Sequence, residues 1–480
     1  MPFDRIDPHD VGTGCPCCQP TLLAAERRIT AELSRRGMLA GTAGAIAMLG
    51  LASGSPAASP PPIVFTNVRL FDGKSSSLRN GMHVLIEGGL IKDVAGGAPG
   101  APMGAKVIDC GGRALMPGLI DAHWHTTFAG LALTELMTSD VDHIVQAAGA
   151  QAARTLMRGF TTVRDLGGPA FPLKKAIDAG QAAGPRIYPS GAMITTTGGH
   201  GDMRPVTDIP RSPGGPLSDI EKSGGAAIAD SADEVRLRVR EQLLLGASQI
   251  KLIGGGGVAS PRTTLDMLTF TLPELHAGVQ AAADRNTYAA VHAYPPAAIR
   301  RAIEAGAQCI EHGHLMDEAT AKLMADRGVW LSTQPFVSED DAMPLTGQSH
   351  ANFLKVLAGT GNLYTLAKKY GIKTAFGSDL LFSPKIVERQ GVMLTHLKRW
   401  YGNAEILKMA TSGNAELLAL SGPRNPYPGK LGVVEAGAHA DLLVVAGDPL
   451  QDIDLLAAPD RNLVVIMKDG TIHKDILAAR

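Results

Sequence analysis

The 480-residue sequence is poor in aromatic residues and has no surplus of charge of either sign. Phe, Trp and Tyr together make up 4% of the chain, and the formal net charge is −1. A nucleic-acid-binding surface needs basic residues that neutralise phosphates and, for single strands, aromatic rings on which bases stack. The composition therefore argues against a nucleic-acid partner. It is that of an ordinary globular protein with enough hydrophobic residues, 45%, for a large core.

Long apolar runs are also scarce. The weakly apolar residues 40–51 are too few to span a bilayer, which needs about 20 residues, so we expect no stable membrane span. This segment follows Arg35 and Arg36 and precedes the small residues 55–59, an order that resembles a twin-arginine export signal. We therefore interpret residues 1–62 as an export segment and expect a periplasmic or extracellular location. A disordered N-terminal arm on a cytoplasmic protein is the alternative.

Cysteine is sparse, and three of the five residues, Cys15, Cys17 and Cys18, lie upstream of the arginine pair. No second cluster of metal ligands stands near them in the sequence. Cys110 and Cys309 lie in apolar, strand-like runs, which indicates buried thiols rather than a disulfide.

Residues 116–422 alternate apolar strand-like runs with amphipathic helical stretches, among them residues 232–245, 272–285, 296–305 and 317–327. The predicted strands are residues 119–125, 160–165, 186–190, 249–254, 288–293, 308–311, 329–334 and 373–378. Eight β/α units in roughly 300 residues are typical of a (β/α)8 TIM barrel. A doubly wound open sheet is the alternative, but no glycine-rich phosphate loop follows the first strand. The four glycines at 254–257 indicate backbone that passes close to another group.

The segments on both sides of this region have β patterns. Residues 63–70, 83–87 and 90–94 precede it, and residues 440–445 and 462–467 follow it. We therefore predict a small β-sandwich domain made from residues 63–115 and 423–480, with the barrel at residues 116–422 between its two parts.

Polar residues of unusual kinds stand where the predicted barrel strands end. His123 and His125 end the first strand, and side chains two residues apart in a strand point the same way. In a TIM barrel the active site lies at the carboxyl ends of the strands. We therefore expect one site that combines residues from five strands: His123, His125, Lys251, His292, His312 and Asp379.

Lys251 lies inside an apolar strand, where an ammonium group without a partner is costly. A buried lysine paired to a carboxylate is the structural interpretation. The functional interpretation is a neutral amine that captures carbon dioxide, and the carboxylated lysine then bridges two metal ions. Imidazole and oxygen ligands suit Zn²⁺, with Mn²⁺, Co²⁺ and Ni²⁺ as alternatives.

Two divalent metal ions in such a site lie about 3.5–4 Å apart and share a water whose pKa falls to about 7. The resulting metal-bridging hydroxide would attack an amide-like carbonyl, and Asp379 would be the catalytic residue that accepts a proton and passes it to the leaving nitrogen. The sequence thus predicts hydrolysis of a C–N bond in a small, carboxylate-bearing molecule such as an N-acyl amino acid or a dipeptide.

The chain resembles the metal-dependent amidohydrolase superfamily. More narrowly, it is similar to the imidazolonepropionase-related branch, which includes Xaa-Pro dipeptidases and ochratoxinase-like amidases. The matching stretches are residues 116–125, 159–165, 197–202, 250–252, 291–294, 310–313, 377–379 and 432–449. The resemblance implies that His123 and His125 bind the more buried metal and that Lys251 and Asp379 complete its ligands. It also implies that Lys251 bridges to a second metal, which His292 and His312 hold.

One departure from this pattern concerns the substrate. Relatives tend to have His-x-His after the fifth strand, whereas here Tyr294 follows His292 two residues on. We expect the Tyr294 phenol to face the substrate carbonyl or oxyanion, and Arg262 to meet a substrate carboxylate. His200 is a second candidate for substrate contact, and a histidine that only orders its loop is the alternative. Arg164 and Asp165, which end the second strand, are expected to form a structural ion pair first and to support the site second.

Two other functions compete with the two-metal amidohydrolase. A cyclic-amide hydrolase or deaminase of the same superfamily would use one metal ion, but Lys251 argues against it because such enzymes lack a bridging lysine at that position. A non-enzymatic scaffold without metal would usually have lost several ligands, and all six are present. The sequence leaves open the substrate, the metal and the oligomeric state, including a homo-oligomer.

Overall fold

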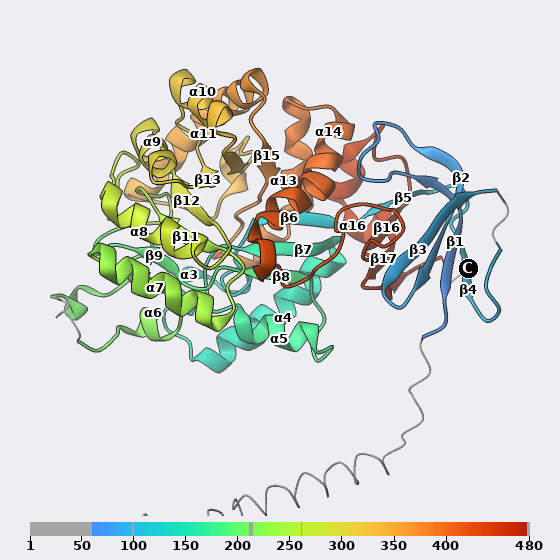
Figure 1. Ribbon diagram of the computed structural model, residues 1–480, viewed down its shortest axis with the longest axis horizontal. Helices are drawn as coiled ribbons and strands as arrows, with labels where there is room; N and C mark the ends of the chain where they lie inside the picture. Colours follow the sequence, from blue (N-terminus) through green and yellow to red (C-terminus); the bar gives the residue numbers. More distant parts are fainter. Residues whose placement is uncertain (1–59, 98–99, 211–214, 261, 478–480) are drawn as a thin grey trace, which may run out of the picture. The chain divides into compact units, whose positions relative to one another are not determined.

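Figure 1 shows the computed structural model of the chain, which describes residues 60–477 apart from 98–99, 211–214 and 261. The twin-arginine-like segment and Cys15, Cys17 and Cys18 lie outside the described residues. Among the residues that are described, no helix is both long and apolar enough to cross a membrane. Cys110 and Cys309 are buried free thiols, as predicted.

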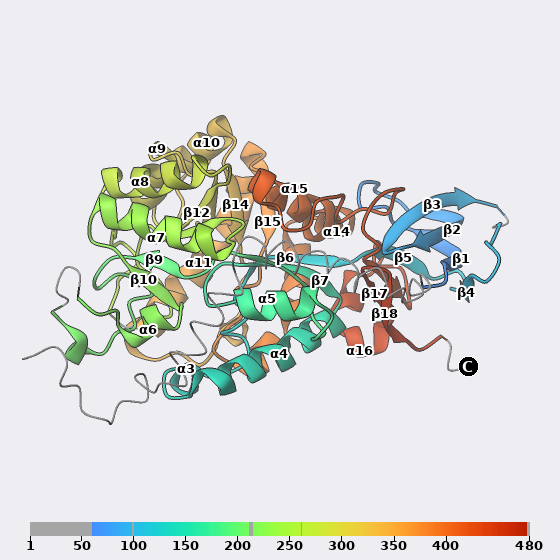
Figure 2. The same cartoon turned by 60° about the horizontal axis from the view of Figure 1, so that its bottom comes forward.

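The larger part of the described chain is a barrel of parallel strands with helices outside it (Figures 1 and 2). Its strands are β6 Leu119–Trp124, β7 Phe160–Asp165, β8 Arg186–Pro189, β11 Ile250–Ile253, β12 Ala289–Ala293, β13 Cys309–His312, β14 Trp330–Thr333 and β15 Thr374–Phe376. Each predicted strand is present within two residues of its expected bounds. The (β/α)8 barrel is confirmed.

The strands are hydrogen-bonded in two groups, β6-β7-β8 and β9-β11-β12-β13-β14-β15, with β10 beside β9. Two polar contacts close the seams between these groups. The Gln249 side-chain amide donates to the Asp165 and Tyr188 carbonyls, at 3.1 and 2.8 Å, and the Asp379 N–H donates to the His123 carbonyl at 2.9 Å. The second contact brings Asp379 next to the end of β6.

The strands β9 Met193–Thr195 and β10 Ala226–Ile228 were not predicted. They lie in the long connection after the third barrel strand and extend the sheet beside β11. Each has only three residues, too few to show the alternation by which a strand is recognised in a sequence.

The helices begin and end at residues suited to those positions. The main ones are α4 Val141–Met157, α5 Phe171–Asp178, α7 Ala232–Leu245, α8 Leu272–Ala283, α9 Pro296–Glu304, α10 Glu318–Arg327, α11 Gly347–Tyr370, α13 Gln390–His396 and α14 Asn403–Lys408. Helix α7 starts at Ser231, whose side chain accepts from the Glu234 N–H, and stops at Gly246 in the left-handed conformation. Helix α8 starts with a capping box of Thr271 and Glu274.

An eight-stranded sheet is made from both flanking segments of the chain, as predicted. Its order is β18-β17-β16-β5-β1-β2-β3, and β4 pairs with β1. The strands are β1 Ile63–Leu70, β2 Arg79–Glu87, β3 Leu90–Gly96, β4 Lys106–Asp109, β5 Ala114–Pro117, β16 Leu442–Val445, β17 Leu463–Lys468 and β18 Thr471–Asp475. Strand β5 leads through Gly118 directly into β6, so the sheet is continuous with the start of the barrel. The exact domain boundaries stay predictions.

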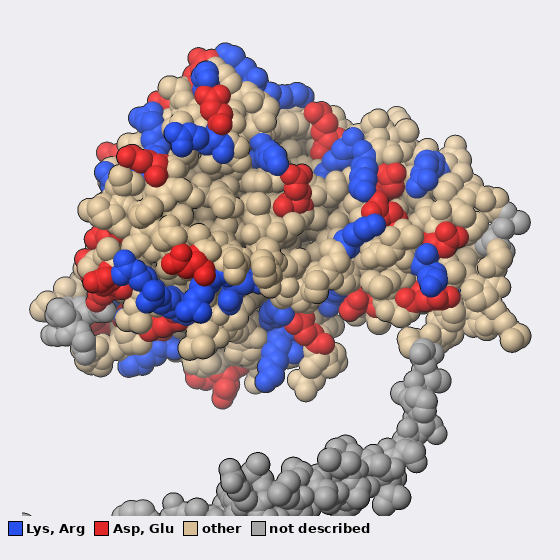
Figure 3. All heavy atoms as spheres, viewed as in Figure 1, with Lys and Arg blue, Asp and Glu red and all other residues tan. Residues whose placement is uncertain are grey.

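Charged side chains lie mainly around the edge of the face seen in Figure 3, with acidic and basic residues interspersed. The middle of that face carries few of them. The mixture agrees with a formal net charge of −1.

Candidate active site

The six residues expected to form a metal site all line one pocket at the carboxyl ends of the barrel strands. His123 is in β6 and His125 follows it, Lys251 is in β11, His292 is in β12, His312 ends β13, and Asp379 follows β15. Five strands therefore deliver these side chains to one place, as the barrel topology predicts.

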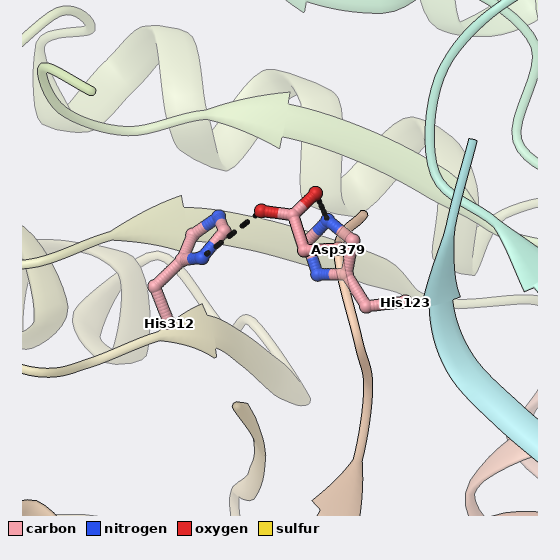
Figure 4. Close-up of side chains that lie close together, drawn as sticks. All are labelled: His123, His312 and Asp379. Carbon is pink, nitrogen blue, oxygen red and sulfur yellow. Dashed lines mark ion pairs between the residues drawn. The ribbon is translucent and has the colours of Figure 1, made fainter. Parts of the chain in front are cut away.

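The Asp379 carboxylate lies at the centre of this group (Figure 4). Its Oδ1 is 3.3 Å from His123 Nε2 and 3.4 Å from His125 Nε2, and its Oδ2 is 3.9 Å from His312 Nδ1. His123, His312 and Asp379 each offer one ligand atom within 4.8 Å of the others, which is close enough to share an ion. Burial opposes ionisation of Asp379, but His123 and His125 hold its pKa below the ordinary value.

Each of the four histidines has one ring nitrogen fixed by an oxygen of the protein. His123 Nδ1 donates to Glu311 at 2.8 Å, His125 Nδ1 to the Gly167 carbonyl at 3.0 Å, His292 Nε2 to the Gly256 carbonyl at 2.9 Å, and His312 Nδ1 to the Gln334 side chain at 2.9 Å. Because these nitrogens carry the proton, the opposite nitrogen of each ring keeps its lone pair. Metal-bound imidazoles are held in this way, so the residues fit a metal site.

Lys251 is a buried amine without a direct ion pair. The residue is only 2% exposed, and no salt bridge within 4.0 Å joins its Nζ to a carboxylate in the described part of the chain. Its Nζ lies 3.5 Å from His123 Nε2. Burial lowers the pKa of Lys251 although the charges of Glu311 and Asp379 oppose this shift, which favours the neutral amine. The described residues therefore show no lysine in direct contact with a carboxylate at this position.

Beneath the site lies an ion pair that the sequence did not predict. Arg164 donates to Glu311 at 2.7 Å and to the Tyr288 hydroxyl at 3.0 Å. Burial would raise the pKa of Glu311, but the Arg164 guanidinium and His123 hold it well below its usual range. Glu311 therefore links the buried Arg164 guanidinium to His123 and orients the His123 ring.

The predicted ion pair between Arg164 and Asp165 is wrong. Neighbouring residues of a strand point to opposite faces. Arg164 points into the barrel, whereas Asp165 accepts from the Thr126 N–H at 2.6 Å and from the Gly167 N–H at 3.2 Å. Asp165 thus fixes the backbone just after His125.

Asp121 is a second carboxylate that sequence analysis missed. It is fully buried and accepts from the Ser378 N–H and hydroxyl, at 3.0 and 2.5 Å, and from Gln390 at 2.8 Å. These bonds tie β6 to the segment that carries Asp379. Burial raises the pKa of Asp121 to about 6. Both Asp121 and Glu311 stand inside apolar strands, the same signal that singled out Lys251.

Two of the three expected substrate contacts lie in the pocket. The Tyr294 ring stacks on His312, with ring centres 4.8 Å apart, and the His200 ring stacks on His292 at 4.5 Å. Burial lowers the pKa of His200 to about 4, so this ring is neutral. A Cβ at Gly257 would lie 2.3 Å from His200 Nδ1, which explains one of the four consecutive glycines.

Arg262, the third expected contact, is exposed and donates to the Arg204 carbonyl at 2.9 Å. It is not among the residues that line the pocket. The structure therefore does not bring Arg262 to the site.

Comparisons with known proteins agree with the predicted resemblance. A sequence model described as the amidohydrolase family matches residues 114–473. Ochratoxinase from Aspergillus niger is 31% identical over 379 residues, which are 75% of each chain. A solved prolidase complexed with N-methylphosphonate-L-proline is 33% identical, with a TM-score of 0.78 over 86% of this chain and 100% of that one. A Xaa-Pro dipeptidase with bound methionine is 29% identical, with a TM-score of 0.75 over the same shares. The chain belongs to the amidohydrolase family, whose members are metal-dependent, and is a hydrolase that acts on carbon–nitrogen bonds.

Proposed function

We propose that the protein hydrolyses the amide bond of a small N-acyl amino acid or dipeptide-like molecule with the help of two divalent metal ions. One observation carries the proposal. The ionised Asp379 lies beside the free Nε2 atoms of His123 and His125, and the Lys251 amine lies beside that of His123, in one buried pocket that His292 and His312 also line. Zn²⁺ is the ion that this set of nitrogen and oxygen ligands suits best.

In this proposal His123, His125 and Asp379 hold one ion, and His292 and His312 hold the other. The lone pair of the neutral Lys251 amine would add to carbon dioxide with loss of a proton from the amine, and the resulting carbamate would supply a further anionic oxygen ligand for the ions. When bound, such a metal pair lowers the pKa of a water and polarises a carbonyl.

The remaining chemistry falls to side chains of the chain itself. Asp379, ionised at neutral pH, accepts the proton of the attacking water and passes it to the leaving nitrogen. Burial raises the pKa of Tyr294 well above its ordinary value, so its phenol stays protonated and can donate to the substrate carbonyl oxygen. The neutral His200, whose ring stacks on that of His292 in the same pocket, is the second proposed substrate contact.

The test is the metal content, by mass spectrometry, of protein purified without chelator, with Lys251→Ala beside the native chain. Lys468→Ala, a half-buried lysine on a strand of the distant sheet, is the matched control. We expect about two metals per chain in the native and control proteins and a loss in Lys251→Ala, whose activity short carboxylic acids should partly restore.

Other outcomes separate the alternatives. One metal in both the native chain and Lys251→Ala would favour a mononuclear cyclic-amide hydrolase or deaminase. No metal in any of the three proteins, or no hydrolysis of N-acyl amino acids and Xaa-Pro dipeptides, would overturn the proposal.

We propose further that residues 1–62 direct export of the enzyme through the twin-arginine route. The support is the order of Arg35 and Arg36, the apolar residues 40–51 and the small residues 55–59. Replacing both arginines by lysine should keep the enzyme in the cytoplasm, as measured by fractionation. Unchanged export would overturn this proposal.

A further inference from the structure

The pocket has an outer half that differs from its polar floor. Apolar side chains from loops, from strand β9 and from helix α11 line it, including Met193, Met203, Val258, Phe336, Phe353 and Phe382. Among the described residues that line the pocket, Lys251 on the floor is the only lysine or arginine. The outer half therefore offers apolar surface and no free cation to a substrate.

Part of this outer half is a thin wall, residues 342–345. Ala342, Met343 and Leu345 line the active-site pocket on one side and also a second cavity, which is lined by Glu339, Lys385 and others. Pro344 of the same segment is exposed. The wall is thus a single layer of chain, and its position determines how wide the active-site pocket is.

Asp341, the residue just before this wall, fixes its start. The Asp341 side chain is completely buried and accepts from the Val337 and Ser338 N–H groups, at 2.9 and 3.0 Å. Arg389, before α13, donates to the same carboxylate at 2.8 Å, and His396 Nδ1 lies 3.5 Å from it. These partners occupy both oxygens of the Asp341 carboxylate. Asp341 therefore holds the wall in place and offers no free carboxylate oxygen to a substrate.

Aromatic rings connect the floor to the wall. The rings of Tyr294, His314, Phe336 and Phe353 follow one another at centre distances of 5.8, 5.6 and 5.2 Å. Phe353 belongs to α11 and lines both cavities, as the wall does. A row of packed rings resists collapse, so the outer half is formed before a substrate enters.

We propose that the outer half of the pocket is a subsite for a bulky apolar group of the substrate, aromatic or branched, and that Asp341 positions its wall through Arg389. The inference rests on the proposed amide hydrolysis and narrows its substrate class. An apolar pocket discriminates between substrates by about 10- to 200-fold for each methylene group that it buries. An enzyme of this design favours amides with a large apolar substituent over those of glycine and acetate.

The first experiment compares kcat/KM for three amides that all keep one carboxylate. They are N-acetylglycine, N-acetylphenylalanine, which is enlarged on the amine side, and N-phenylacetylglycine, which is enlarged on the acyl side. We expect kcat/KM for at least one aromatic substrate to exceed that for N-acetylglycine by tenfold or more. Tenfold is about the smallest effect expected from burying a single methylene group. If neither exceeds it, the subsite is overturned while amide hydrolysis stands.

Calorimetric binding of the same three compounds to the metal-loaded enzyme separates the subsite from the proposed reaction. If none is cleaved but an aromatic compound binds at least tenfold more tightly than N-acetylglycine, the subsite is supported and the proposed reaction fails. Equal binding of all three compounds overturns the subsite, whether or not any is cleaved.

The second experiment tests the positioning role with Asp341→Asn and Arg389→Gln. Both variants should lower the preference for the aromatic substrate, in kcat/KM relative to N-acetylglycine, by several-fold, mainly through KM. Asp454→Asn is the matched control, because Asp454 forms a half-exposed ion pair with Lys398 and is not among the residues that line either cavity. Equal losses on both substrates, with the preference unchanged, would overturn the role. Arg389 is one-third exposed, so Arg389→Gln carries the test if Asp341→Asn does not fold.

Discussion

The interior of the barrel and the core of the eight-stranded sheet are built in opposite ways. The barrel buries Lys251, Arg164, Glu311 and Asp121 among its strands, whereas the sheet buries a large apolar cluster and few polar side chains, such as His83. Burying charged groups costs stability unless each is paired. The barrel thus carries the groups needed for chemistry at a cost, and the sheet adds apolar burial without that cost.

Two cations inside the barrel show the same contrast at closer range. Arg164 has a carboxylate at 2.7 Å, whereas Lys251 has none within 4.0 Å among the residues described. Burial opposes the charge of both and Glu311 favours it in both, but the directly paired Arg164 has its pKa raised well above the ordinary value, whereas the pKa of Lys251 is lowered because burial outweighs the charges of Glu311 and Asp379. The paired cation stabilises the site, and the unpaired one is left available for reaction.

The largest effect is expected at the catalytic end of the barrel. Asp379→Asn removes the group that transfers the proton but keeps its shape, so kcat/KM should fall by about 10²- to 10⁴-fold. Because Asp379 is also a proposed metal ligand, the metal content of the variant is measured beside its activity, and the midpoint of urea unfolding is compared in chelated protein, where it should change little. Activity within tenfold of the native enzyme would show that another residue transfers the proton.

Glu311→Gln should lower both the free energy of unfolding and the affinity for metal, because Glu311 pairs with Arg164 and also orients His123. Breaking a buried ion pair costs about 3–5 kcal/mol in the free energy of unfolding. Loss of the carboxylate that orients His123 should also weaken metal binding by about 10- to 100-fold. Urea unfolding and titration with a competing chelator measure the two effects.

Glu318→Gln is the control for this variant, since Glu318 pairs with Lys369 on the surface and its loss should leave both quantities unchanged. Normal metal affinity in a destabilised Glu311→Gln would limit Glu311 to a structural role.

A substitution in the sheet should change stability alone. Leu442 in β16 is completely buried in the apolar core of the sheet. Leu442→Ala should lower the free energy of unfolding by about 2–5 kcal/mol, as other buried leucines do. The kcat of the protein that remains folded should equal that of the native enzyme. A large fall in kcat would show that the sheet also controls the geometry of the site.

The smallest effect concerns pH and His314, whose pKa burial lowers to about 4. Between pH 6.5 and 4 the unfolded chain binds this proton more readily than the folded chain does. The stability due to neutral His314 is therefore complete above pH 6.5 and is lost as the pH falls toward 4. In chelated protein, the native chain should lose up to about 1.4 kcal/mol per pH unit relative to His314→Phe. If the free energy of unfolding depends on pH in the same way in both proteins, the lowered pKa of His314 is contradicted.

The sequence predicted the eight barrel strands and the two-part sheet because each strand is a short apolar run bounded by turns. It also predicted the six residues that line the floor of the pocket, since polar residues at strand ends stand out against such runs. The pairing of Arg164 could not be predicted in the same way. A strand's sequence shows which residues share a face, but Glu311 lies on another strand, and only the closed barrel brings it opposite Arg164.

Loops limited the prediction of the substrate side of the site. Arg262 follows the glycine run, and nothing in that order of residues shows whether its side chain turns inward or outward. The anchoring of the wall at residues 342–345 could not be predicted for a similar reason. Its anchor, Asp341, is one of three consecutive acidic residues, and a sequence does not show which of them is buried.

Strand β5 has β1 on one edge and β16 on the other, and Gly118 after it donates to the Asp441 carbonyl at 2.8 Å. On the ribosome, residues 114–117 emerge early, but the strand that completes their pairing is made after the entire barrel. Strand β6, with His123, starts at this junction. A polypeptide released before residue 442 would therefore begin its first barrel strand from an open sheet edge. Unfinished chains are by this design exposed to proteolysis and aggregation before they can act as enzymes.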